Sequence, residues 1–191
     1  MAAGLIALAL LAVAIFFAAR FFSKPAIESM ARLHELEKID GRFVRSGGGT
    51  PFTGVVVEYY SDGQLRSRTQ IRDGLLHGIS EAWHANGQIQ IRETFKDGVA
   101  NGPRTKWRED GSKESEGIVV DGRFEGCFTQ WHANGKPDRS VEMRRGVPHG
   151  VSRAWHASGF LKTRVRLDQG KVVEQAFFEE SQRVVEPAPA T

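Results

Sequence analysis

The sequence has little of several features that would point to a particular chemistry. Its single cysteine, Cys127, excludes an intramolecular disulfide framework and a zinc site built on cysteines. Its 26 basic and 23 acidic residues nearly balance, with a formal net charge of +3, and no basic run is longer than the pair Arg144-Arg145. This charge pattern does not suggest nucleic-acid binding.

Hydrophobic residues are also scarce once the first 22 positions, which contain 20 of them, are set aside. They make up about a third of the remainder, which is poor for a thick two-layer core and favours a thin, turn-rich, all-β architecture. Glycine, by contrast, is abundant, with 21 residues among 191. Because these glycines follow neither the collagen period nor a Gly/Ser tract, turns are the expected use of the excess.

The apolar N-terminal segment, residues 1–22, is expected to be a transmembrane anchor. Met1 to Ala19 has no charged side chain, and a helix of that length would span roughly 28 Å, close to the hydrocarbon thickness of a bilayer. A cleaved signal peptide, with a secreted or periplasmic protein, is the alternative. Arg20 and Lys24 follow the apolar run and nothing basic precedes it, which favours a cytoplasmic location for the rest of the chain.

Residues 23–51 are expected to form a helical stalk followed by a glycine-rich loop. Ser23 can cap a helix, Pro25 suits its first turn, and apolar residues then follow at near-helical spacing as far as Asp40. Residues 47–49 are three glycines that mark a loop. A phosphate-binding loop would need a following helix and a Lys-Ser/Thr pair, and the sequence has neither there.

The central feature of the sequence is self-similarity at a spacing of 24 residues. Five copies without gaps place fifteen glycines in three rows and five aromatic residues, one per copy, in a fourth row. The rows are Gly54, Gly78, Gly102, Gly126 and Gly150; Gly63, Gly87, Gly111, Gly135 and Gly159; Gly74, Gly98, Gly122, Gly146 and Gly170; and Tyr59, Trp83, Trp107, Trp131 and Trp155. A period of this size indicates a repeat array whose units stack on one another.

Each repeat is predicted to be one β-hairpin. Asx-Gly pairs such as Asn86-Gly87 are strong hairpin signals, because glycine adopts positive φ without a steric penalty, and Asp73-Gly74 and its equivalents supply a second turn. Residues 52–174 are therefore predicted to form a curled, single-layer antiparallel sheet of ten strands, with residues 175–191 as a C-terminal tail. Strand alternation predicts one apolar, aromatic face, on the inside of a trough, and one polar face. On this basis Ile79 and Trp83 share one side, and Ile89, Ile91 and Phe95 share a side of the second strand.

These repeats resemble MORN repeats, and more closely the YwqK-type variant that is described as an antitoxin repeat. The signature is an aromatic residue, two further residues, Asp/Asn-Gly, a second glycine turn and a closing glycine, and it is found in residues 58–65, 82–89 and 73–78. Lys113 and Pro137 depart from it after the hairpin turn, as do Arg145 and Gln169 before the second turn glycine. The resemblance implies a curled β-hairpin sheet that acts as a binding or scaffolding module and, for the YwqK type, neutralisation of a partner toxin.

The sequence gives no sign of a catalytic, cofactor or metal site. His84, His132 and His156 each follow the tryptophan of their repeat, but equivalent positions on successive hairpins are about 10 Å apart, too far to share one metal ion. No Ser-His-Asp, Cys-His or paired-carboxylate arrangement emerges, because the polar residues recur by repeat position. We therefore expect that the protein is not an enzyme.

A surface that binds a partner or lipid is the remaining candidate site. Arg68, Arg92 and Arg164 occupy one repeat position, and with the three histidines they are candidates for a basic surface along the sheet that meets an acidic partner or anionic lipid. The alternative is a solvated face that discourages edge aggregation. The tryptophan row is expected to pack in the core rather than to stack on a ligand.

Together these patterns predict a membrane-tethered β-repeat module that binds a protein partner, in one form as an antitoxin-like immunity protein. The alternative is a membrane-surface scaffold whose basic sheet face contacts anionic lipid.

Overall fold

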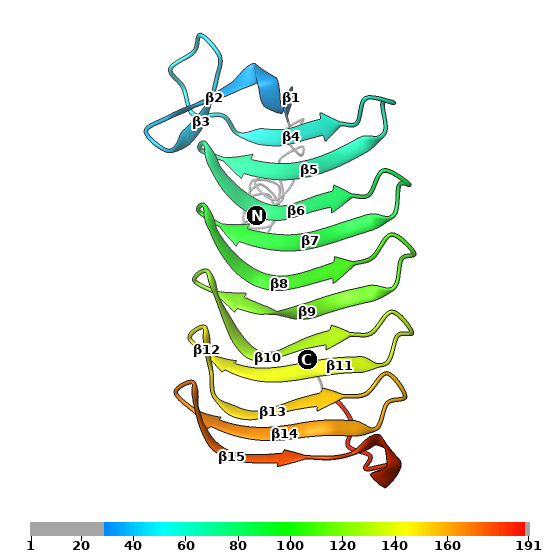
Figure 1. Ribbon diagram of the computed structural model, residues 1–191. Coiled ribbons are helices and arrows are strands. Elements are labelled where there is room, and N and C mark those ends of the chain that lie inside the picture. Colours follow the sequence, from blue (N-terminus) through cyan, green and yellow to red (C-terminus); the bar gives the residue numbers. More distant parts are fainter. Residues whose placement is uncertain (1–28, 190–191) are drawn as a thin grey trace, which may run out of the picture.

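The computed structural model describes residues 29–189, most of which form one long, open β-sheet, with a separate two-stranded sheet near its N-terminal end (Figure 1). Two short 3-10 helices, η1 (Leu33–Glu35) and η2 (Glu180–Gln182), lie near its ends. The strands are β1 (Met30–Arg32), β2 (Leu36–Ile39), β3 (Arg42–Arg45), β4 (Gly54–Tyr59), β5 (Leu65–Arg72), β6 (Leu75–Trp83), β7 (Ile89–Lys96), β8 (Val99–Trp107), β9 (Lys113–Val120), β10 (Arg123–Trp131), β11 (Pro137–Arg144), β12 (Val147–Pro148), β13 (Gly150–Trp155), β14 (Leu161–Asp168) and β15 (Lys171–Phe177).

The predicted hairpin repeats are confirmed. Strands β4 to β15 pair with their neighbours in chain order and antiparallel, apart from the short β12, which pairs with β11 only. The turns within the hairpins, such as Asn86-Gly87, lie along one side of the sheet, and the second turns, such as Asp73-Gly74, which join successive hairpins, lie along the other side (Figure 1). In each second turn both central residues have positive φ, as in Asp73 (50°) and Gly74 (77°), which matches the backbone of a type I′ hairpin turn. Arg145 and Gln169 adopt the same conformation, so their departure from Asp leaves the turn intact.

The prediction of a single apolar, aromatic face is wrong, because every hairpin contains a register shift beside its aromatic residue. Ala82 lies opposite Ile91 but Trp83 lies opposite Ile89, so one residue of β7 is passed over. Residues that lie opposite each other share a face, and a shift of one residue therefore moves Ile89 to the side of Trp83, away from Ile91 and Phe95.

Two faces follow from this register. The aromatic face contains Tyr59, Trp83, Trp107, Trp131 and Trp155. The glycine face contains the closing glycines of the repeats together with an apolar row opposite or beside them, formed by Ile71, Phe95, Val119, Met143 and Leu167. Apolar side chains are thus divided between both sides of the sheet.

Buried side chains gather at the two ends of the sheet. At the N-terminal end Ala31, Phe52, Val56 and Ile71 form a cluster with several half-buried neighbours. At the other end Trp155 is 2% exposed and Leu161 is 0% exposed. Most side chains of the middle strands are only half-buried, as expected because no second layer packs on the sheet within residues 29–189.

The helix predicted from residue 23 to Asp40 is wrong for its described part, residues 29–40, whereas residues 47–49 lie in a turn and loop as predicted. Strand β1 pairs in parallel with β4, with Ala31 opposite Val56, and β2 and β3 form a hairpin. The turn of that hairpin is Asp40-Gly41, with φ of 49° and 77°, the same dipeptide and backbone as the second turns of the repeats. Burial of Ala31 and strand pairing outweigh a near-helical spacing that has little apolar area of its own.

The anchor or signal peptide predicted for residues 1–22 lies outside the described residues. Within residues 29–189, no helix has both the length and the apolar character needed to cross a membrane.

Candidate interaction surfaces

The side chain that follows each aromatic residue links neighbouring repeats. The Nε2 atoms of His84, His132 and His156 lie 2.9, 3.0 and 3.2 Å from the main-chain oxygens of Trp107, Trp155 and Phe178. A carbonyl oxygen can only accept, so Nε2 carries the hydrogen in each ring. Tyr60 and Arg108 donate in the same way from the other two repeats, to the oxygens of Trp83 and Trp131. The histidines proposed for a partner or lipid surface are thus half-buried and lock the register between repeats.

The arginines predicted to form a basic row lie on the aromatic face but are not alike. Arg68 is exposed. Arg92 pairs with Glu81 at 2.7 Å, and Arg164 pairs with Glu186 at 2.9 Å. The equivalent positions in the third and fourth repeats hold Glu116 and Ser140, so positive charge does not run continuously along the sheet.

The tryptophan row differs in exposure along the sheet. Tyr59 is 44% exposed, whereas Trp83, Trp107 and Trp131 are half-buried. Lys113 Nζ lies 5.0 Å from the centre of the Trp131 ring, within the range of a cation–π contact. Trp155 is the fully buried member of the row, because the C-terminal segment covers it.

The C-terminal segment, residues 178–186, folds back over the last repeat. The predicted tail begins as part of β15, and Phe178 then donates its amide to the oxygen of Lys162 at 2.9 Å. After η2, Val184 accepts from the Leu161 amide at 2.7 Å, and Glu186 accepts from the Trp155 indole through its main-chain oxygen, also at 2.7 Å. The segment thus passes from β14 to β13 across the strands.

Glu186 holds this segment by charge as well. Its carboxylate lies 2.6 Å from Arg153 Nε and 2.9 Å from Arg164 Nη1. The hydrogen bond from Arg153 is the largest cause that lowers the pKa of Glu186 below its ordinary value; partial burial opposes it and Arg164 adds to it. Sequence reasoning missed this contact, which joins residues 33 positions apart and has no local signal.

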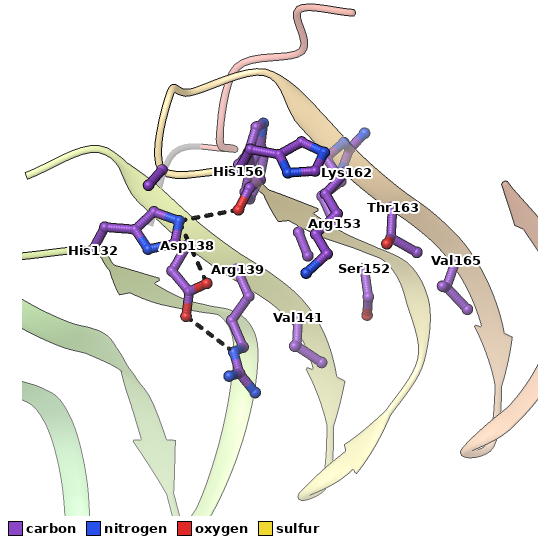
Figure 2. A pocket seen from close by; sticks show the side chains of 13 residues that line it. His132, Asp138, Arg139, Val141, Ser152, Arg153, His156, Lys162, Thr163 and Val165 are labelled. Atoms are coloured by element: carbon purple, nitrogen blue, oxygen red, sulfur yellow. Dashed lines mark hydrogen bonds and ion pairs between the residues drawn. The ribbon is translucent and has the colours of Figure 1, made fainter. Parts of the chain in front are cut away.

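A groove of about 520 Å³ lies on the glycine face at β11, β13 and β14 (Figure 2). Its floor includes Val141, Ala154 and Val165, and Ser152 and Thr163 lie beside them. Cross-strand pairing brings these residues together, with Ala154 opposite Thr163 and Ser152 opposite Val165. The Oγ atom of Ser152 is buried and has no hydrogen-bond partner among the described residues.

The rim of this groove carries two cationic side chains, Arg139 and Lys162, and one acid, Asp138 (Figure 2). His132 and His156 also line it. Asp138 lies 3.6 Å from His132 Nε2 and 3.5 Å from Arg139 Nε, and the Arg139 side chain is 57% exposed. The arginine therefore keeps most of its donors open to solvent.

The described residues offer binding chemistry. Within residues 29–189 no group of three or more His, Cys, Asp or Glu is placed to hold a metal ion. Cys127 is half-buried, with its sulfur 3.4 Å from the hydroxyl of Thr129. The two faces instead present half-buried aromatic rings on one side and an apolar groove with a cationic rim on the other.

Comparison with known proteins bears on the repeats. No curated protein matches the chain. The family described as a MORN repeat variant matches residues 52–73 and 76–97, which cover hairpin β4–β5 and all but the first residue of hairpin β6–β7. These matches, followed by three further hairpins in the same 24-residue register, support a MORN-repeat protein.

Proposed function

We propose that the protein is a β-repeat module that binds a protein partner and has no catalysis of its own. The observation that carries this proposal is the groove on the glycine face, which joins an apolar floor to a cationic rim. Such a site suits an acidic side chain flanked by apolar residues. The MORN repeat variant match agrees with a binding module.

The chemistry of the rim supports an acidic partner segment. Arg139 is available for a bidentate contact with a carboxylate, since its only acidic neighbour among the described residues, Asp138, lies 3.5 Å from its Nε. Ser152 Oγ offers an unused donor in the floor. A carboxylate that reaches both would satisfy a buried hydroxyl that is otherwise unpaired.

A toxin is the partner that the YwqK-type resemblance suggests, and antitoxin-like neutralisation is the specific form of our proposal. The apolar segment 1–22 would then tether the sheet to a membrane, and its flanking Arg20 and Lys24 favour the cytoplasmic side. Both points rest on the sequence.

A scaffold that binds anionic lipid through a basic sheet face has less support. Arg92 and Arg164 are already paired with carboxylates, and Glu116 and Ser140 interrupt their row. Paired cations attract a membrane surface weakly, because their charge is largely cancelled within the protein.

The test compares two double variants of the full chain that remove the same charge. Arg139→Gln with Lys162→Gln changes the groove, and Arg68→Gln with Lys96→Gln changes exposed cations elsewhere. We expect a partner that co-purifies stoichiometrically from the native host to be lost with the groove variant only. Equal retention or equal loss by both variants contradicts the groove, and flotation of the unmodified protein with anionic liposomes at low salt would favour the lipid scaffold.

A further inference from the structure

We infer that the aromatic face binds a proline-rich segment of a partner protein, in the polyproline II conformation, along Trp83, Trp107 and Trp131. This surface lies on the side of the sheet opposite the groove, and it rests on different observations. Three of them point to this ligand: a segment already seated at one end of the row, unused indole donors, and the spacing of the rings.

The first observation is that one end of the row already holds a segment of the chain, outside any strand, through its main-chain oxygens. Val184 and Glu186 accept hydrogen bonds from Leu161 and Trp155 through main-chain oxygens, and Pro187 and Pro189 follow. A residue that precedes proline is biased toward the β and polyproline II regions, which favours an extended backbone at Glu186. The segment lies across the strands instead of pairing along them.

The second observation is that the other tryptophans keep an unused donor. The Trp155 indole N–H is satisfied by a peptide oxygen, at 2.7 Å. Among the described residues, the indole nitrogens of Trp83, Trp107 and Trp131 donate no hydrogen bond like that of Trp155, although their rings are half-buried. A half-buried indole combines an apolar surface with one polar donor, and a peptide backbone meets both needs.

The third observation is the spacing of the rings. Neighbouring strands are about 4.8 Å apart, so equivalent tryptophans on successive hairpins are about 9.6 Å apart. Polyproline II has three residues per turn and rises about 3.1 Å per residue, which returns the same side of the peptide every 9.3 Å or so. A β-strand covers a similar distance in three residues, but residues three apart in a strand point to opposite sides, so every second residue of the peptide that reaches a tryptophan would point away from it. The match thus favours polyproline II.

The neighbours of the free tryptophans define what the peptide carries. Glu186 is bound by Arg153 and Arg164, whereas the same two positions of the fourth repeat hold Thr129 and Ser140, both buried. Neither of these two positions has a basic side chain that would bind an acidic residue of the peptide. Lys113 covers one side of the Trp131 ring, so a ligand reaches this ring from its other side and its N–H edge. The partner segment is therefore rich in proline and close to neutral.

The test uses the full chain and a fluorescently labelled peptide of about four Pro-Ala-Pro triplets, long enough to reach three rings. Anisotropy should show saturable binding that changes little between low and high salt, because no ion pair is involved. Trp107→Phe keeps the aromatic ring but removes the indole N–H, and should weaken binding about threefold to tenfold, as for the loss of one hydrogen bond. Trp83→Phe should weaken binding of the peptide to a similar extent.

Three comparisons make the outcome decisive. A peptide with glycine in place of every proline should bind at least tenfold more weakly, since it must be ordered on binding. The groove variant Arg139→Gln with Lys162→Gln should bind the proline peptide as the unmodified protein does, so failure of the groove proposal would not affect this result. Circular dichroism checks that each variant is folded.

Several results would overturn the inference. They are no saturable binding of the proline peptide, equal binding of the glycine peptide, or unchanged affinity in both folded tryptophan variants. Self-association that depends on protein concentration and disappears in Pro187→Ala would show that the C-terminal segment of a second copy occupies the row, and would replace the partner protein as the ligand.

Discussion

The contact of Glu186 with the last repeat allows the sharpest prediction about how the C-terminal segment is held on the end of the sheet. Glu186→Gln keeps the size of the side chain but removes the charge that binds Arg153 and Arg164 at 2.6 and 2.9 Å. Hydrogen bonds to charged groups contribute about 1.5–3 kcal/mol when shielded, and exposed ion pairs contribute less than about 1 kcal/mol. Glu186, Arg153 and Arg164 side chains are 25%, 22% and 47% exposed, so we expect a loss of about 1–2 kcal/mol.

This loss should appear as local opening of the C-terminal segment. The Leu161 amide donates to the oxygen of Val184, so its hydrogen exchange reports how often the segment leaves β14. A loss of 1–2 kcal/mol should speed that exchange about 5- to 30-fold. Amides in the middle of the sheet, such as that of Phe95 in β7, should exchange at an unchanged rate.

Glu174→Gln is the matched control, because Glu174 pairs with Arg166 at 3.4 Å with both side chains exposed. It removes the same charge from a pair that contributes little, and Leu161 exchange should change less than about threefold. The reasoning is refuted if Glu186→Gln leaves the Leu161 amide protected, or if the two substitutions accelerate its exchange equally.

Three further predictions concern the same elements. Because the pKa of Glu186 is lowered when the C-terminal segment is in place, ionised Glu186 stabilises that segment at pH values above the ordinary glutamate pKa of about 4.3. This stabilisation is lost as the pH falls through the lowered pKa. The emission of Trp155 should therefore shift to longer wavelength on acidification, but not in Glu186→Gln. In urea titrations, Gly74→Ala should lower the free energy of unfolding by about 2–3 kcal/mol and Gly122→Ala by only about 1 kcal/mol. Both glycines have a φ of 77°, so both substitutions strain the backbone. Only at Gly74 would the new Cβ also lie 2.7 Å from another carbon, the Cβ of Arg42. His132→Leu should cost about 1 kcal/mol by the same titration, since the oxygen of Trp155 loses its donor; an unchanged midpoint would contradict the linking role of this position.

The hairpins were predictable from the sequence because turn chemistry is local. An Asx-Gly pair needs no distant partner to favour positive φ, and Asp73-Gly74 adopts the conformation that its composition indicates. The same signal was present in Asp40-Gly41, where it marks the β2–β3 hairpin, but a near-helical spacing of apolar residues favoured a helix instead. Local turn chemistry was the better guide in that segment.

The division of side chains between the faces was not predictable from alternation alone. One passed-over residue beside each aromatic position reverses the side of everything beyond it, so Ile89 and Ile91 lie on opposite faces. The covered state of Trp155 was also beyond sequence reasoning, because it depends on Glu186, which lies outside the repeats. The groove depends likewise on β11, β13 and β14 lying side by side, whereas no single strand has a binding pattern.

The distribution of burial explains why such a sheet leaves surface free for partners. A single layer covers neither face of its middle hairpins, so their tryptophans stay half-buried and their stability depends on bonds between neighbours, such as those from His84 and His132. Among the described residues, the chain covers the two ends of the sheet, with β1 and the β2–β3 hairpin at one end and the C-terminal segment at the other (Figure 1). Because the repeats are equivalent in register, a ligand that fits one middle hairpin meets the same geometry on the next, and affinity grows with the number of hairpins that it spans.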